Sequence, residues 1–315
     1  MRLVAYKQKN TLGPYRMGVV HHENVLDLQE AYRLYLLKRD QVDLANAIEH
    51  VLPSDLTSFF KLGEQSIQHA QVALNFAEEH DVSAISFLFH DVTLAPPVPN
   101  GAKVICIGTN YKNHVAEMKA NIPEYPVLFS KFSNALIGAN DDIQKSPYTE
   151  KLDYEGEFTV VIGKEASHVK KENALDYIAG YTIGNDISAR DLQKRTPQWL
   201  QGKSLDKSTP IGPWIVTADE LTDPSNVQIE TYVNGEKRQS SNTKHLIFNI
   251  PTLIEFISSL ITLQPGDVIL TGTPDGVGFA MDPPQFLKAD DTIRIEVAGV
   301  GVLENKVVDM ETPDQ

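Results

Sequence analysis

A proline-rich segment divides the sequence into two parts of different character. Residues 94–101 read Leu-Ala-Pro-Pro-Val-Pro-Asn-Gly. Three prolines within four positions can continue neither a helix nor a central β-strand. The segment therefore predicts a linker between a small N-terminal domain, residues 1–95, and a larger C-terminal domain, residues 101–307.

Apolar runs of strand length dominate the sequence beyond this linker. Residues 227–233 alternate apolar and polar side chains and end at Asn234-Gly235, a dipeptide typical of a two-residue hairpin turn. One helix is indicated over residues 250–260, where apolar residues recur at helical spacing. Strands outnumber helices and do not alternate with them, so we expect a β-rich α+β fold and not a doubly wound sheet. The other strand-like runs are Val104–Ile107, Phe158–Ile162, Val268–Leu270 and Ile293–Val297.

The smaller N-terminal part predicts a mixture of strands and helix. Met17–Val20 and Val25–Leu28 are strand-like, and apolar residues recur at helical spacing over residues 67–77. We therefore expect a small α/β accessory domain. His21 and His22 have no catalytic partner in any motif and are interpreted as ordinary surface residues.

Charge and composition exclude several classes of function. The chain has 28 basic and 42 acidic residues and a net charge of −14, which repels a nucleic-acid backbone. No apolar run approaches the ~18 residues that a membrane span needs. The single cysteine, Cys106, excludes an internal disulfide and a cysteine metal cluster. The charged start of the sequence does not resemble a secretory signal, so we expect a cytoplasmic protein.

Acidic residues precede and enter the predicted strand at Phe158–Ile162. Glu155 and Glu157 are two positions apart, so on a strand they project from the same face. Two carboxylates this close repel unless a cation or a proton intervenes, and Mg²⁺ and Mn²⁺ take oxygen ligands of this kind. Asp186 follows the apolar segment 178–183 and offers a third carboxylate. The alternatives are an exposed strand edge for the glutamates and a helix N-cap for Asp186.

Three further motifs carry side chains suited to catalysis or binding. His114 and Glu117 are three positions apart and share a face on a helix, where a carboxylate makes an imidazole more basic. Lys203, in Gly-Lys-Ser-Leu-Asp, offers positive charge to an anionic site, and a plain surface lysine is the alternative. The glycine-rich run 271–278 is either a structural turn or a loop that contacts a substrate carboxylate.

The order of these motifs resembles that of the fumarylacetoacetate hydrolase family, and in particular its bacterial acylpyruvase and oxaloacetate decarboxylase-like members. The matching runs include Gly-Asn-Asp-Ile-Ser-Ala-Arg-Asp at 184–191 and Thr-Gly-Thr-Pro-Asp-Gly-Val-Gly at 271–278, and the resemblance extends over residues 103–307. It implies a rolled, multi-sheet catalytic domain that is commonly a homodimer. The N-terminal residues resemble the accessory region of bacterial members.

The resemblance also implies a role for each matching residue. Glu155, Glu157 and Asp186 match the ligands of a Mg²⁺ or Mn²⁺ ion. His114 and Glu117 match a dyad that lies on a mobile lid and activates water. The remaining matches are a lysine beside the metal, Lys203, and three residues that face the substrate, Arg190, Gln193 and Thr273.

With these roles, we expect metal-dependent cleavage of a C–C bond in a small 2-oxo acid through a metal-stabilised enolate. Hydrolysis of an acylpyruvate such as fumarylpyruvate and decarboxylation of oxaloacetate both meet this description. One alternative is a 2-oxo acid isomerase or hydratase of aromatic catabolism, which also stabilises an enol but need not break a C–C bond. The other alternative is a metal-binding regulatory protein without catalysis.

A lid is predicted between Val115 and Phe132. The segment has no glycine, contains Pro123 and Pro126, and shows no long periodic pattern. Segments of this kind often close over a bound substrate. A fixed surface loop is the alternative, although long loops in compact domains are usually functional or disordered.

Overall fold

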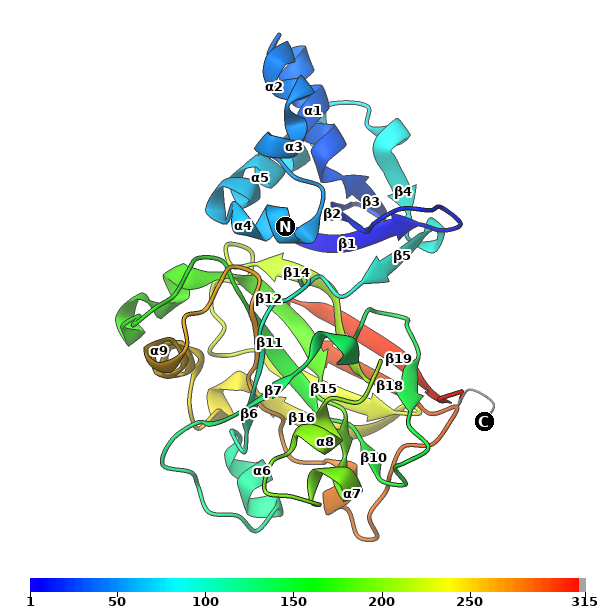
Figure 1. Ribbon diagram of the computed structural model, residues 1–315, viewed down its shortest axis with the longest axis vertical. Helices are drawn as coiled ribbons and strands as arrows, with labels where there is room; N and C mark the ends of the chain where they lie inside the picture. Colours follow the sequence, from blue (N-terminus) through cyan, green and yellow to red (C-terminus); the bar gives the residue numbers. More distant parts are fainter. Residues whose placement is uncertain (312–315) are drawn as a thin grey trace.

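A large open sheet runs through most of the molecule (Figure 1). The computed structural model describes residues 1–311. The twelve strands of this sheet are β1 (Arg2–Gln8), β2 (Arg16–His21), β3 (Asn24–Asp27), β4 (Ser86–Leu88), β5 (Val92–Ala95), β6 (Val104–Gly108), β7 (Val127–Lys131), β8 (Leu136–Ile137), β11 (Gly156–Ile162), β12 (Ile178–Asn185), β14 (Thr209–Thr217) and β17 (Val268–Leu270). Their order is β4-β3-β2-β1-β14-β12-β11-β17-β6-β7, with β5 paired to β1 and β8 paired to β14.

Two smaller sheets complete the strand-rich part. One has five strands, β9 (Ile143–Lys145), β15 (Gln228–Val233), β16 (Glu236–Asn242), β18 (Thr292–Val297) and β19 (Gly301–Asp309), and the other pairs β10 (Leu152–Asp153) with β13 (Ser188–Ala189). The predicted hairpin joins β15 to β16, and its turn residues Asn234 and Gly235 have φ values of 52° and 80°. Both values lie in the left-handed region that a tight hairpin turn requires.

The helices lie around these sheets and are mostly short. They are α1 (Leu28–Lys38), α2 (Val42–Asn46), α3 (Ile48–Val51), α4 (Leu56–Lys61), α5 (Glu64–Glu79), α6 (Lys112–Glu117), α7 (Arg190–Gln193), α8 (Leu200–Lys203) and α9 (Ile250–Leu260). The predicted helix at 250–260 is confirmed, and Asn249 caps it by accepting a hydrogen bond from the Thr252 N–H. No helix within residues 1–311 is long and apolar enough to cross a membrane.

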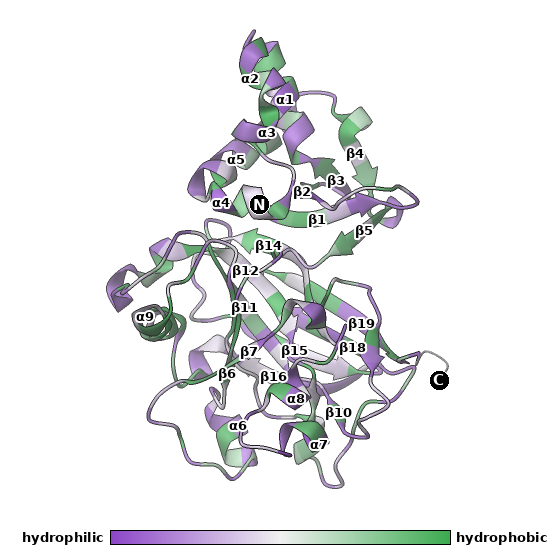
Figure 2. Cartoon of the chain, viewed as in Figure 1, coloured by the Kyte–Doolittle hydropathy of each residue, from purple (hydrophilic) through white to green (hydrophobic). Residues whose placement is uncertain are grey.

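Strand β11 is buried along its whole length because both faces of the large sheet are covered. Val160 belongs to a cluster with α9 and the five-stranded sheet, whereas its neighbour Val161 belongs to a cluster with α1 and α5. This alternation explains the uninterrupted apolar run of the strand. Figure 2 shows that α9 consists mostly of hydrophobic residues, in keeping with its place against the core.

The N-terminal elements form one end of the molecule, and α6, α7 and α8 form the opposite end (Figure 1). Strand β1 pairs antiparallel with β14, so the large sheet continues from the N-terminal part into the C-terminal part. The strand-rich α+β class with an α/β N-terminal part is as predicted. The division into domains at residues 95 and 101 stays a prediction.

The interpretation of His21 as a surface residue was wrong. It is 8% exposed, because the end of β2 packs against α5, and its Nε2 lies 3.4 Å from Glu78 Oε1. His22, the next residue, has a largely exposed side chain.

Candidate active site

Three buried carboxylates come together at the ends of two paired strands. Glu157 lies on β11, Glu155 immediately precedes that strand, and Asp186 immediately follows β12. Because β11 and β12 pair antiparallel, with Gly156 opposite Asn185, their ends bring Asp186 next to Glu155. One carboxylate oxygen from each residue lies within 4.8 Å of the others. None of the three is more than 6% exposed, which excludes the exposed strand edge as an explanation.

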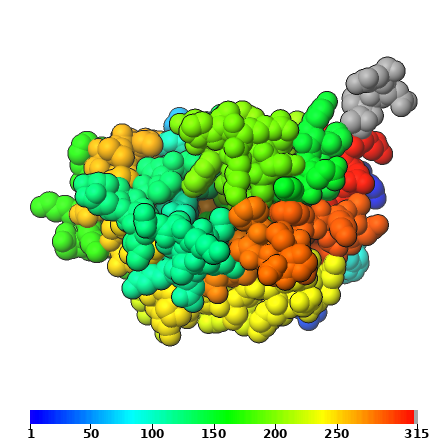
Figure 3. All heavy atoms as spheres, turned by 90° about the horizontal axis from the view of Figure 1, so that it is seen from below, coloured from blue at the N-terminus to red at the C-terminus, as the bar shows by residue number. Residues whose placement is uncertain are grey.

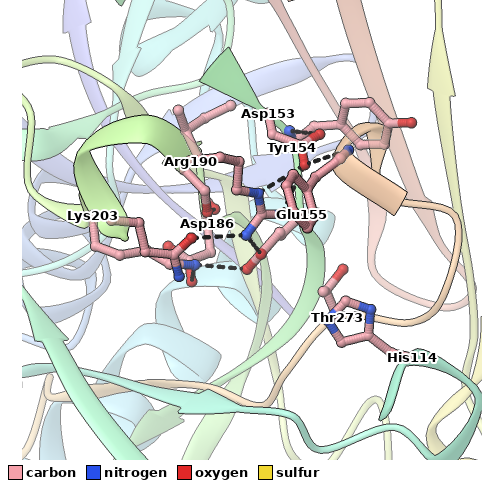
Figure 4. A network of polar contacts seen from close by, with 12 residues as sticks. His114, Asp153, Tyr154, Glu155, Asp186, Arg190, Lys203 and Thr273 are labelled. Carbon is pink, nitrogen blue, oxygen red and sulfur yellow. Dashed lines mark hydrogen bonds and ion pairs between the residues drawn. The ribbon is translucent and has the colours of Figure 1, made fainter. Parts of the chain in front are cut away.

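Glu155 and Asp186 are paired with buried cations (Figure 4). Lys203 Nζ lies 2.8 Å from Glu155 Oε2 and 2.6 Å from Asp186 Oδ2, and Arg190 Nη1 lies 2.7 Å from Glu155 Oε1. Burial opposes the ionisation of Glu155, but Lys203 and Arg190 outweigh it and hold its pKa well below the usual range. Burial likewise opposes the charge on Lys203, but Asp186 and Glu155 prevail and raise its pKa.

Glu157 is the carboxylate of this cluster that lacks a cation. Its Oε2 accepts a hydrogen bond of 2.7 Å from the Gly272 N–H, and no cationic side chain within residues 1–311 lies within 4.0 Å of it. Burial, followed by the negative charges of Asp186 and Glu155, raises the pKa of Glu157 well above its ordinary value. A buried carboxylate in this position holds either a proton or a cation. The donor set therefore fits a hard divalent ion such as Mg²⁺ or Mn²⁺.

The predicted histidine–glutamate pair is formed on α6. His114 Nδ1 lies 3.2 Å from Glu117 Oε2, and Glu117 Oε1 accepts a hydrogen bond of 2.9 Å from the Gly276 N–H. The second contact ties α6 to the glycine-rich loop that follows β17. Since a carboxylate accepts at Nδ1, the ring proton lies on Nδ1, and Nε2 is left as the nitrogen available to a bound molecule.

A cavity of about 210 Å³ connects these groups. Two of the predicted site residues do not line it: Glu117 contacts His114 and Asp186 contacts Lys203. The volume is below the ~300–1,000 Å³ of typical pockets for drug-sized ligands, so the cavity suits a small substrate. The predicted residues that line it are His114, Glu155, Glu157, Arg190, Gln193, Lys203 and Thr273.

The cavity lies at the end of the molecule away from the N-terminal helices. Figure 3 shows this face, where the segment around α6 (teal), the region of α7 and α8 (yellow-green) and the loop 271–290 (orange) meet. A wider groove of about 750 Å³ elsewhere on the surface is lined by residues such as Asn234, Lys288 and Asp309. That groove contains none of the predicted site residues.

Lys131 belongs to the same network of buried ion pairs as Asp186 and Lys203, but it was not predicted as a site residue. Its Nζ lies 2.6 Å from Asp186 Oδ1 and 3.0 Å from the Ile187 carbonyl oxygen, and its side chain is fully buried. Lys131 falls within the segment predicted as a lid, and nothing in its local sequence marks it as a site residue.

Asp153 positions both Arg190 and the glycine-rich loop. Its Oδ2 accepts hydrogen bonds from Arg190 Nε at 2.9 Å and from the Phe279 N–H at 3.0 Å, and its Oδ1 accepts one from the Gly278 N–H at 2.9 Å. Arg190 in turn donates from Nη1 to Gln193 Oε1 at 3.2 Å. The two predicted substrate-facing residues of α7 are therefore held in one network.

Thr273 has its hydroxyl group committed within the protein. The hydroxyl donates to the Gly156 carbonyl oxygen at 3.0 Å and accepts from Gln239 Nε2 at 2.8 Å. Gln239, on β16, was not predicted, and its Oε1 also accepts from the Gly156 N–H at 3.0 Å. The predicted contact of Thr273 with substrate would therefore have to use an acceptor lone pair or the backbone.

The segment predicted as a lid, Val115–Phe132, has regular structure on both sides of a central loop, and its closure stays a prediction. α6 ends at Glu117, and β7 is an edge strand of the large sheet, paired antiparallel with β6. Within this segment, residues 118–126 and Phe132 lack regular structure. Met118 and Ala120 from this segment line the cavity, so its position can affect access.

A strand-rich fold with buried carboxylates beside a histidine–glutamate pair and a small cavity is the arrangement of an enzyme. The chain belongs to the fumarylacetoacetate hydrolase family. Residues 103–308 match the family described as Fumarylacetoacetate (FAA) hydrolase C-terminal. The resemblance drawn from the motifs is thus confirmed.

Similar proteins cover nearly the whole chain. The mitochondrial oxaloacetate tautomerase fahd2 of Xenopus laevis is 39% identical over 310 residues, covering 98% of this chain and 90% of its own length. The oxaloacetate tautomerase YisK of Bacillus subtilis is 41% identical over 297 residues, covering 92% and 94%.

Solved structures share the fold over the same length. The fumarylacetoacetate hydrolase of Exiguobacterium antarcticum is 35% identical with a TM-score of 0.78, covering 98% of this chain and 100% of that chain. A maleylpyruvate hydrolase from Sphingobium, in complex with manganese(II) and pyruvate, is 27% identical with a TM-score of 0.74, covering 99% and 100%.

Proposed function

We propose that this protein is a divalent-metal-dependent enzyme that interconverts the keto and enol forms of a short 2-oxo acid, with oxaloacetate as the first candidate. The carrying observation is the position of Glu157, a buried carboxylate without a cation, in the same small cavity as His114. The two oxaloacetate tautomerases at 39% and 41% identity support this reaction. Enol chemistry without C–C cleavage, an alternative from the sequence, thereby becomes the leading proposal.

A divalent ion held by Glu155, Glu157 and Asp186 would act as a Lewis acid toward the oxygens of a 2-oxo acid. His114 would remove a proton from the carbon next to the keto group through Nε2. Glu117 would hold the ring in place and stabilise the imidazolium that forms. These roles use the one imidazole nitrogen that the dyad leaves free.

A direct assay of tautomer exchange tests this proposal. The keto and enol forms of oxaloacetate are followed by ultraviolet absorbance, and products by NMR, with metal-free protein and after addition of Mg²⁺ or Mn²⁺. We expect exchange well above the buffer rate in the metal-loaded protein only, without accumulation of pyruvate. If no 2-oxo acid of a broad panel reacts faster than in buffer, the proposed function is wrong.

C–C bond cleavage, the first expectation from the sequence, is the second candidate. The similar maleylpyruvate hydrolase, solved with manganese(II) and pyruvate, favours it. A water molecule activated by His114 would attack the distal carbonyl of an acylpyruvate and release pyruvate and an acid. In the same NMR assay run with an acylpyruvate, stoichiometric pyruvate and free acid would assign hydrolysis, whereas pyruvate and CO₂ from oxaloacetate would assign decarboxylation.

The lid is expected to become ordered when ligand binds. Oxalate resembles the enolate of a 2-oxo acid and would occupy the cavity that Met118 and Ala120 line. We expect amide hydrogen exchange across residues 118–126 to slow when oxalate is added to the Mg²⁺-loaded protein. The hairpin at 228–242 should exchange equally with and without oxalate. Equal exchange of residues 118–126 in both states would identify a fixed loop.

The homodimer, the cytoplasmic location and the choice between Mg²⁺ and Mn²⁺ stay predictions. Analytical ultracentrifugation, cell fractionation and metal analysis of the purified protein would check them separately.

A further inference from the structure

The cavity carries three long cationic side chains, and two of them are already neutralised. Arg190 pairs with Asp153 at 2.8 Å and with Glu155 at 2.7 Å, and Lys203 pairs with Glu155 and Asp186. Because these carboxylates already offset their charges, Arg190 and Lys203 attract a further anion less strongly than an unpaired cation does. The third cation of the cavity wall is Lys194.

Lys194 lacks a carboxylate partner among residues 1–311. No Asp or Glu oxygen lies within 4.0 Å of its ammonium group, which instead lies 3.6 Å from the centroid of the Phe279 ring. Lys194 is only partly covered, whereas Lys203 is fully buried, so Lys194 lies nearer the mouth of the cavity. Phe279 also lines the cavity and holds the ammonium at its edge.

The position of Lys194 follows from α7. Residues three and four positions apart lie on one face of a helix, so Arg190, Gln193 and Lys194 all face the cavity. Partial burial, followed by the positive charges of Arg190 and Lys151, lowers the pKa of Lys194. An anion at the cavity mouth would relieve this repulsion.

We propose that Lys194 determines specificity by binding the second carboxylate of a dicarboxylate substrate, whose 2-oxo acid end lies at the Glu155–Glu157–Asp186 cluster. The acidic ligands line the buried part of the small cavity, and the unpaired cation lines its exposed part. A short 2-oxo dicarboxylate has the complementary arrangement, with a metal-chelating end and a distal anion. This inference rests on the proposed function, because it takes the chelating end of the ligand to be a 2-oxo acid.

A comparison of two unreactive ligands isolates the contribution of the distal carboxylate to binding. Malate and lactate share a 2-hydroxy acid end, and malate alone has a second carboxylate. We expect calorimetric titration of the Mg²⁺-loaded wild type to show tighter binding of malate. Lys194→Met should weaken malate binding by ~10-fold, as expected for a charge-assisted hydrogen bond, and leave lactate binding unchanged. The difference should shrink at high ionic strength.

Arg195→Met is the matched control. Arg195 is the next residue, is also exposed, and does not line the cavity. Replacement of Arg195 removes the same charge from the same segment and should change the affinity for neither malate nor lactate. In turnover of oxaloacetate, Lys194→Met should raise KM and leave kcat nearly unchanged, because the contact is made equally in ground and transition states.

The outcomes distinguish this role from the proposed function. If the wild type turns over 2-oxo acids but Lys194→Met keeps the wild-type preference for malate over lactate, Lys194 has no role in specificity and the proposed function stands. The same conclusion follows if Arg195→Met weakens malate binding equally, since the effect is then one of general charge. If the wild type binds neither ligand and reacts with no 2-oxo acid, both proposals are wrong.

Discussion

Replacement of Glu157 by glutamine is expected to remove most of the divalent-metal affinity and to slow turnover by about 10³-fold, since Lewis-acid stabilisation is worth several kcal/mol and each ~1.4 kcal/mol is a tenfold change. Glutamine keeps the shape of the side chain but removes one of three negative charges from the donor set. Metal content after dialysis, measured by mass spectrometry, and titration of the metal-free protein with Mn²⁺ would measure the loss. Steady-state rates at saturating metal would show how much activity more metal restores.

Glu304→Gln is the control for this experiment, because Glu304 lies on β19 with its side chain 49% exposed. It should leave metal content and rate unchanged. Wild-type Mn²⁺ affinity in Glu157→Gln would contradict the assignment of Glu157 as a ligand.

The pH dependence of the thermal stability of the metal-free protein provides a second test of the environment of Glu157. Because the folded protein raises the pKa of Glu157, the stability from this group is fully present below the ordinary glutamate pKa and is lost as the pH rises through the raised value. In a chelator, thermal unfolding of the wild type should therefore shift to lower temperature with rising pH. Glu157→Gln should show a smaller shift, since it carries no proton to lose.

Local spacing predicted two of the contacts within the candidate site. Glu155 and Glu157 are two positions apart at the start of a buried strand, and the period of a strand brings their carboxylates together. His114 and Glu117 are three apart on a helical turn, and they make the expected contact. In both cases, the two residues are close in the sequence, so the repeat of a single strand or helix determines whether their side chains lie on the same face.

Residues that reach the site from distant elements could not be found in this way. Lys131 contacts Asp186 across 55 positions, and Gln239 bonds the Gly156 N–H across 83. Each contact depends on which strands lie side by side, and the sequence does not state the order of strands in a sheet. Asp153 lies only two positions before Glu155, but its role depends on its bond with the Gly278 N–H, 125 positions away in the sequence.

Strand β7, within the segment predicted as a lid, was missed for a related reason. Residues 127–131 form β7 because β6 offers them a partner, and the strand carries Ser130 and Lys131 where an isolated reading expects a loop. The buried ammonium of Lys131 is tolerated there only because Asp186 and a carbonyl oxygen receive it. Lys131 is therefore a polar residue that contacts the candidate site, and its presence made the strand β7 difficult to predict from the sequence.

His114→Ala is expected to slow turnover by ~10²–10⁴-fold, the usual contribution of a general acid–base group, while metal content stays at the wild-type level. The two effects separate because His114 bonds to Glu117 and lines the cavity but is not part of the cluster of three carboxylates. His90→Ala, at a side chain 75% exposed and outside the cavity, should change neither quantity.

The companion variant Glu117→Gln tests whether the carboxylate acts through the imidazole. Glutamine can still accept a hydrogen bond from Nδ1, but it does not stabilise a positive ring, so the rate should fall less than in His114→Ala. The double variant should turn over substrate only slightly more slowly than His114→Ala alone, because Glu117 has no role once the imidazole ring is absent. If Glu117→Gln adds its full effect in the absence of His114, the carboxylate acts independently, through its bond to Gly276, and the two residues are not a catalytic pair.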